Sequence, residues 1–299
     1  MRRIEGGCAV KVIGMDFTSC PGPTKQITYL SCNLENGVLK TCDLRNLPNF
    51  NAFETVLSAP GSWIAGIDFP FGQSERFIET VGWPLEWASY VNFVSGLDRE
   101  RFCKILNDYR KPRSKGDKEH RRVTDCAAES ISPQKLYGVP VGKMFFEGAP
   151  RLLKAGVMIP GLQKGDPTRI VVEAYPAVLA RKFIRKKPYK NDNKKKQTND
   201  QREARRELLR QITDAPLLEY GISVVADAAF VDDPTGDQLD ALLCAIQAAW
   251  SWLQRENCFG APSNSDHLLE GWIADPKCRI GQSSVRRPGS DPQQRAKTR

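Results

Sequence analysis

The chain has 299 residues, of which 40% are hydrophobic and 26% are charged, values that are ordinary for a globular protein. No apolar run approaches the roughly 20 residues that a membrane-spanning helix needs, and the first residues lack the continuous apolar segment of a signal peptide, so we expect a cytoplasmic protein without membrane contact. The formal net charge of +9 favours an anionic partner, nucleic acid above all, and nothing indicates a protein partner.

The first 70 residues predict a mixed sheet. Strands are expected at 8–18, 26–33 and 38–43, and the Asn36-Gly37 pair between the last two is typical of a tight hairpin turn. Residues 51–59 have helical spacing, and the apolar segment 62–68 predicts a fourth strand. A three-strand meander, a helix and a strand reached by a crossover imply a sheet with both parallel and antiparallel neighbours.

The next stretch, at about 72–165, is expected to be a largely helical insertion and not a separate domain. Helical patterns cover 84–97 and 99–109, and 110–122 is a polar, basic loop. Residues 168–176 restore a buried strand, and Pro176 or Ala177 opens a helix towards Arg185, since proline is well tolerated at a helix start.

The remainder of the chain predicts two long helices and one strand. Residues 181–206 hold twelve Lys or Arg and three acidic residues, which indicates a basic loop followed by a helix over 200–212. A last strand is expected within 221–230, and 235–256 has the clearest helical periodicity. We therefore expect one domain over 1–278 and a disordered basic tail over 279–299.

Acidic residues recur where apolar strands end. Asp16, Asp68 and Glu173 each follow such a run, and Asp237 and Asp240 stand three residues apart at the head of the last helix, so they share one helical face. Because the ends of neighbouring strands in an α/β sheet meet at one edge, we expect all five side chains to converge. Taken singly, each Asp at a strand end can be a turn former, and Asp237 can be a helix cap.

A carboxylate cluster of this kind predicts a metal centre. The sequence has only His120 and His267, and its nine cysteines show no CxxC pair and indicate free thiols in a reducing compartment, so carboxylates must supply most ligands. Such oxygen ligands suit Mg²⁺ or Mn²⁺. Two ions about 3.5–4 Å apart can activate water and stabilise the leaving oxygen of a phosphodiester. We predict catalytic roles for Asp16, Asp68, Glu173 and Asp240, and metal binding by Asp16, Asp68, Asp237 and Asp240.

Five motifs carry a resemblance: "GMDFTS", "GIDFPF", "VEAYPA", "DQLDALLCA" and "EGWIADP". Together they resemble the predicted-nuclease family called domain of unknown function 429, over roughly residues 8–276. The resemblance implies a ribonuclease H-like fold in which Asp16 is the first-strand ligand, Asp68 the fourth-strand carboxylate and Asp240 the final-helix ligand. The final-helix pattern is similar to that of Holliday-junction resolvases, with Asp237 assisting. Glu173 matches the family's own E-x-Y-P motif.

The basic segments predict contacts with a phosphate backbone. Arg121, Arg122, Lys187, Lys190 and Arg205 are the expected contacts, although each can also be an ordinary solvated side chain. The sequence therefore favours a two-metal nuclease acting on DNA or RNA. A non-catalytic nucleic-acid-binding protein and an actin-like ATPase or kinase remain open, although the glycine-rich phosphate loops of nucleotide-binding proteins are missing.

Overall fold

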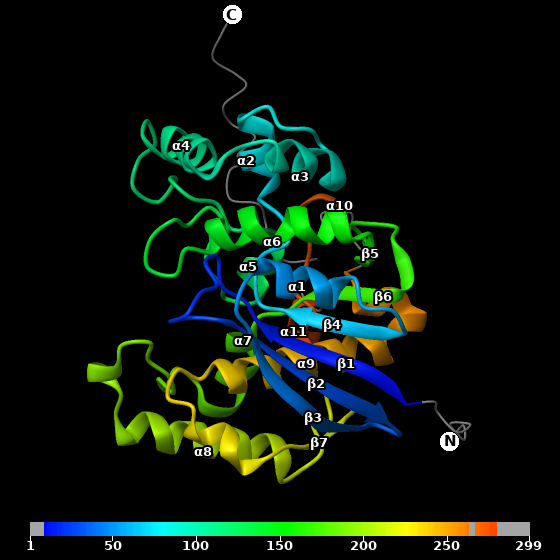
Figure 1. Cartoon of the computed structure of the whole chain (residues 1–299). Coiled ribbons are helices and arrows are strands. Elements are labelled where there is room, and N and C mark those ends of the chain that lie inside the picture. The colour runs from blue at the N-terminus through cyan, green and yellow to red at the C-terminus, as the bar shows by residue number, and fades with distance from the viewer. Residues whose placement is uncertain (1–8, 263–266, 280–299) are drawn as a thin grey trace, which may run out of the picture.

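A computed structural model describes residues 9–262 and 267–279 of the chain, and one mixed sheet runs through its centre (Figure 1). Its strand order is β5-β6-β4-β1-β2-β3-β7. The strands are β1 (Val10–Asp16), β2 (Ile27–Glu35), β3 (Val38–Leu47), β4 (Trp63–Ile67), β5 (Val157–Met158), β6 (Asp166–Glu173) and β7 (Ser223–Val225).

Strand β1 lies at the middle of the sheet. It pairs antiparallel with β2 and parallel with β4, and β4 pairs parallel with β6. The β2–β3 hairpin turns at Asn36 and Gly37, which have φ values of 50° and 77°, the left-handed conformation that this dipeptide tolerates. The predicted meander, crossover helix and fourth strand are confirmed, and the mixed sheet is consistent with a ribonuclease H-like fold.

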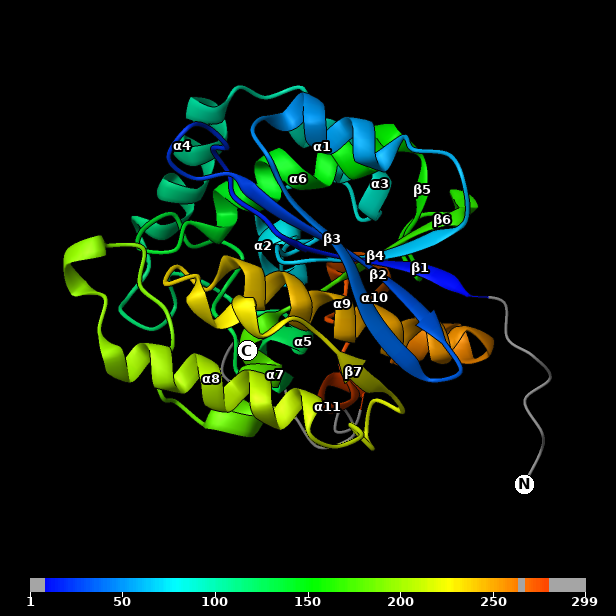
Figure 2. The same cartoon turned by 60° about the horizontal axis from the view of Figure 1, so that its bottom comes forward.

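Helices cover both faces of the sheet. The α-helices are α1 (Phe50–Leu57), α2 (Glu75–Thr80), α3 (Trp87–Ser95), α4 (Arg99–Arg110), α5 (Val123–Ala127), α6 (Val141–Ala155), α7 (Pro176–Ile184), α8 (Asn199–Thr213), α9 (Asp237–Leu253), α10 (His267–Glu270) and α11 (Pro276–Arg279). Short 3₁₀ helices are η1 (Lys194–Lys196), η2 (Ala228–Asp232) and η3 (Arg255–Gly260). Helices α1, α3 and α6 belong to the core on one face, and α7, α8 and α9 to the core on the other (Figures 1 and 2).

The segment between β4 and β6 is mostly helical, as its sequence predicts. Helices α3 and α4 pack on α6 on the side away from the sheet (Figure 1). Residues 141–155, for which no separate element was predicted, form one continuous helix that includes Pro150. The short edge strand β5, which was not predicted, follows it and pairs with β6.

Helix α9 packs directly against the backbone of β1 and β4. Gly14 and Gly66 are neighbours in the β1–β4 register, and both face the helix. A Cβ atom at Gly14 would lie 1.8 Å from the Ala241 carbonyl oxygen, and one at Gly66 would lie 2.4 Å from that of Cys244. The two glycines therefore let the helix approach the strands more closely than any other residue would allow.

The described chain ends with helix α11, and none of its helices fits a membrane span. Arg279, assigned to the tail, ends α11, and the rest of the predicted disordered tail, 280–299, lies outside the described residues. Within 9–262 and 267–279, no helix combines the length and the apolar character needed to cross a bilayer.

Candidate functional site

Two carboxylates lie side by side at the end of the central strands. Asp16 is the last residue of β1, and Asp68 directly follows β4. The Asp68 amide donates a hydrogen bond of 3.0 Å to the Met15 carbonyl, which continues the pairing of the two strands. Since side chains alternate along a strand, Asp16 faces the same side as Gly14, toward α9. The predicted convergence of strand-end carboxylates therefore holds for this pair.

Helix α9 brings its own two carboxylates to the same place. Burial raises the pKa of Asp16 well above its usual value; Lys190 opposes this shift, whereas Asp240, Asp237 and Asp68 add to it. Burial and the Asp240 charge likewise raise the pKa of Asp68 to about 7. The four aspartates thus repel one another, as expected of negative charges gathered in a small volume.

Two lysines bind the helix carboxylates. The Tyr189 hydroxyl donates a hydrogen bond to one oxygen of Asp240, and the Lys190 ammonium forms an ion pair with the other oxygen. Lys25 binds Asp237 at 2.9 Å. The structure therefore gives Asp240 two partners that its sequence position does not reveal. The loop that carries Lys25 has no pattern that could have identified it.

The carboxylates of Asp16 and Asp68 have no such partners. Among the described residues, no side chain or backbone group donates a hydrogen bond to either of them, and both line an open pocket of about 510 Å³. Lys25 and Lys190 also line this pocket, which the segment 138–140 closes on another side. A pocket of this size suits a small ligand or part of a polymer. We call it the Asp16 pocket.

The donor set of the Asp16 pocket fits a hard divalent cation. Mg²⁺ is usually held by one or two carboxylates, keeps several waters and also binds substrate phosphates. Asp16 and Asp68 supply two unengaged carboxylates, whereas Asp240 is 0% exposed and both its oxygens are engaged. In the described part of the chain, no three His, Cys, Asp or Glu side chains are grouped so as to hold an ion. Asp16 and Asp68 are therefore the two carboxylates free to ligate an ion, whereas metal binding by Asp237 and Asp240, which pair with lysines, stays a prediction.

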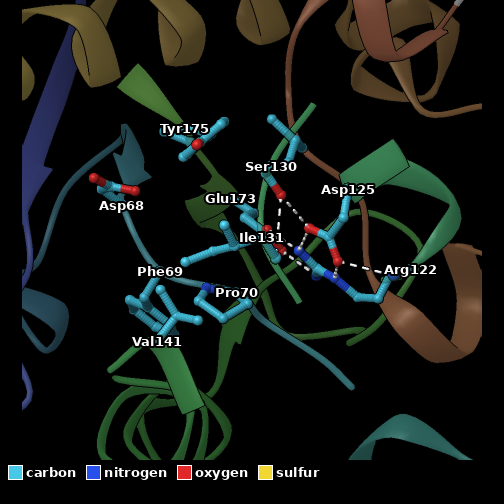
Figure 3. A pocket seen from close by; sticks show the side chains of 12 residues that line it. Asp68, Phe69, Pro70, Arg122, Asp125, Ser130, Ile131, Val141, Glu173 and Tyr175 are labelled. Carbon is cyan, nitrogen blue, oxygen red and sulfur yellow. Dashed lines mark hydrogen bonds and ion pairs between the residues drawn. The ribbon is translucent and has the colours of Figure 1, made fainter. Parts of the chain in front are cut away.

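Glu173 does not join this group, contrary to the prediction that all five acidic side chains converge. Its neighbour Val172 packs in the core that contains α9, and Val171 packs in the core on the opposite face. Because side chains alternate along β6, Glu173 points to the face away from α9. Figure 3 shows Asp68 apart from the Glu173 carboxylate, although both line one small cavity of about 40 Å³ and the Glu173 charge helps to raise the pKa of Asp68.

Glu173 instead belongs to a buried ion cluster. Arg122 donates to its two carboxylate oxygens at 2.5 and 2.8 Å, and binds Asp125 with two bonds of 2.9 Å (Figure 3). The Phe71 amide also donates to Glu173 at 2.8 Å. Arg122 is only 1% exposed and donates to the carbonyl of Glu270. The Arg-x-x-Asp spacing is compatible with the Arg122–Asp125 ion pair. No local sequence pattern predicts that Arg122 also binds Glu173.

The five predicted nucleic-acid contacts divide into three kinds. Arg121 and Lys187 are exposed, and the Lys190 side chain is 42% exposed at the Asp16 pocket. Arg122 and Arg205 are buried and bind internal partners, so as placed here they cannot contact a phosphate backbone. The prediction is corrected for these two residues, since a charged residue in a basic segment can be folded inward when internal acceptors compensate its burial.

Fold and site together define an α/β protein whose central mixed sheet carries an acidic, lysine-bordered pocket beside the buried helix α9. The chain belongs to the family described as protein of unknown function (DUF429), whose model matches residues 31–266. That range includes Asp68 and the α9 carboxylates, and Asp16 precedes it. Neither a curated protein nor a solved structure matched the chain.

Proposed function

We propose that this protein is a nuclease that hydrolyses phosphodiester bonds of DNA or RNA with the aid of a divalent cation, Mg²⁺ or Mn²⁺. The observation that carries the proposal is the Asp16 pocket, in which two carboxylates that accept no hydrogen bond from residues 9–262 or 267–279 lie beside two lysine ammonium groups. Carboxylates attract a cation, and ammonium groups attract phosphate oxygens. A phosphate ester that binds together with a divalent cation requires both charges in one pocket.

Each residue of the pocket has a distinct role in this proposal. Asp16 and Asp68 hold the cation, which when bound makes water a better nucleophile and polarises a phosphoryl oxygen. Lys25 and Lys190 balance the charge of the substrate phosphate. Asp237 and Asp240 orient these lysines through their ion pairs. Glu173, predicted to be catalytic, holds the neighbouring segments together through Arg122 and has no direct part in the reaction.

The net charge supports a polyanionic substrate. The formal charge of +9 raises the local concentration of nucleic acid near the protein, without selecting a sequence. Arg121 and Lys187 are exposed and available for backbone contacts.

The test is a cleavage assay with single-stranded, double-stranded and branched DNA and RNA, in Mg²⁺, in Mn²⁺ and in a chelator. We expect cation-dependent products ending in 3′-hydroxyl and 5′-phosphate groups, and loss of cleavage in Asp16→Asn and Asp68→Asn. Asp200→Asn, which changes an exposed carboxylate on α8, is the matched control and should cleave like the unchanged protein.

Two results would reject the proposal in favour of the alternatives. Salt-sensitive binding without cleavage in any divalent ion would identify a nucleic-acid-binding protein. Saturable binding and hydrolysis of ATP, lost in the same two variants, would identify an ATPase or kinase.

A further inference from the structure

The ion pairs at the Asp16 pocket leave two carboxylates free to ligate a divalent cation. Lys190 pairs with Asp240. Lys25 pairs with Asp237 at 2.9 Å and with Asp192, an exposed carboxylate that also lines the pocket, at 3.1 Å. Among the carboxylates that the structure describes there, Asp16 and Asp68 have no ion-pair partner, and when ionised they carry two negative charges, which one divalent ion balances.

The Lys190 ammonium is held in place by its surroundings. The buried Arg205 donates to the Tyr189 carbonyl at 2.8 Å, and the Asn191 amide donates to the Pro234 carbonyl at 3.2 Å. A Cβ atom at Gly236 would lie 2.8 Å from the Lys190 Cβ, so the lysine lies directly against the start of α9. Contacts on both sides of Lys190 thus fix the backbone that presents it to Asp240.

We propose, on the basis of the nuclease function above, that the site works with a single divalent cation between Asp16 and Asp68. Lys190 takes the position beside Asp240 that a second ion would need, and presents its ammonium to the substrate phosphate. Asp240 and Tyr189 are then positioning residues, and Arg205 supports the segment that carries the lysine. This arrangement replaces the two-ion site predicted from the sequence.

A second cation is disfavoured because it would have to remove the ion-pair partner of Asp240. Asp240 is completely buried, and a buried carboxylate that loses its partner is strongly destabilising. A second cation could bind Asp240 only by displacing the Lys190 ammonium, and so must compete with a charge that belongs to the fold. In the described part of the chain, no ammonium or guanidinium group forms an ion pair with Asp16 or Asp68, although Lys25 and Lys190 lie near them.

The experiment counts Mn²⁺ ions bound per chain by electron paramagnetic resonance titration, without substrate. We expect one ion for the unchanged protein. Lys190→Met keeps most of the length of the side chain but removes its charge and frees one Asp240 oxygen, so we expect two ions. Lys186→Met, at an exposed position of the same segment, is the control and should bind one. Asp240→Asn should also keep one ion, whereas Asp16→Asn should lose it.

The outcomes separate this inference from the nuclease proposal. Two ions on the unchanged protein, together with cleavage, would overturn the single-ion site and leave the nuclease standing. A folded Lys190→Met variant that still binds one ion would overturn the role of the lysine. No bound ion and no cleavage would overturn both. The ion count on the unchanged protein tests the single-ion site without any variant, and the folded Lys190→Met variant tests the role of the lysine.

Discussion

The Arg122 guanidinium is a positive charge placed deep in the interior. Burial would lower the pKa of Arg122, but Asp125 and Glu173 raise it well above its usual value, so the side chain remains charged. Its bonds link α5, the end of β6 and the segment before α11. The residue next to it, Arg121, is exposed. Adjacent arginines thus have opposite environments.

This contrast gives a direct stability test. Arg122→Met leaves two buried carboxylates without their cation, and breaking a buried pair in this way costs about 3–5 kcal/mol. Arg121→Met changes an exposed side chain and should alter stability by no more than about 0.5 kcal/mol. Urea unfolding followed by circular dichroism measures both. Equal losses in the two variants would contradict the structural role of the cluster.

Glu270 predicts a pH dependence of stability. Its carboxylate is buried and accepts hydrogen bonds from the amides of Glu75 and Val123. Burial raises its pKa from 4.5 to about 7; the two amides and Arg122 oppose the shift, and Asp125 adds to it. Between pH 4.5 and about 7, Glu270 therefore keeps its proton in the native protein but has lost it in the unfolded chain. The free energy of unfolding then falls as the pH rises from about 4.5 to about 7.

The contribution of Glu270 is isolated by removing its charge. A shift of this size corresponds to about 3 kcal/mol of stability lost across that pH range. Glu270→Gln should lose less stability than the unchanged protein between pH 5 and pH 7.5, as measured by urea unfolding at each pH. Glu79→Gln, an exposed carboxylate on α2, is the control and should keep the original pH profile. If the free energy of unfolding of Glu270→Gln depends on pH in the same way as that of Glu79→Gln, Glu270 is not the source of the pH dependence.

At the level of elements, the position of α9 depends on two glycines. The helix is buried along nearly its whole length and carries Asp237 and Asp240 at its first turn. It reaches β1 and β4 only because Gly14 and Gly66 have no side chain. The distance between the Asp16 carboxylate and the α9 carboxylates is therefore set by residues that have no chemistry of their own.

Gly14→Ala tests this dependence. The added methyl would clash with the backbone of α9, so we expect a loss of about 1–3 kcal/mol from overpacking. Because the helix must move, we also expect weaker Mn²⁺ binding at the Asp16 pocket. Gly22→Ala places its methyl in open space and is the control. Thermal unfolding and Mn²⁺ titration of both variants provide the measurements, and unchanged values for Gly14→Ala would refute the close contact.

At the level of the whole molecule, the positive charge predicts salt-dependent binding of nucleic acid. Each phosphate contact contributes about 0.7–0.9 to the slope of log K against log salt concentration. Arg121→Gln and Lys187→Gln should each reduce that slope by about this amount if the residue contacts the backbone. Lys40→Gln, an exposed lysine on β3, is the control. Fluorescence anisotropy at several salt concentrations measures the slope, and a slope unaltered by both substitutions would place the nucleic-acid path elsewhere.

The sequence by itself determined the four strands β1 to β4 and the helix α9. Apolar runs, the Asn36-Gly37 turn and the periodicity of 235–256 are local patterns, and they correctly predict β1 to β4 and α9. The acidic residues at the ends of β1 and β4 could be identified as a candidate site because parallel neighbours end at a common edge. Local patterns suffice for these features because each depends on a few consecutive residues.

Only the tertiary structure decided which charges meet. Strand β6 is apolar on both faces where it approaches Glu173, so its sequence has no alternation that shows which face the carboxylate occupies. Likewise, Lys25 and Lys190 reach α9 from loops more than 45 residues away along the chain, and Arg122 reaches Glu173 across 51 residues. Burial and ion pairing depend on where distant segments pack, and no local pattern in the sequence encodes that.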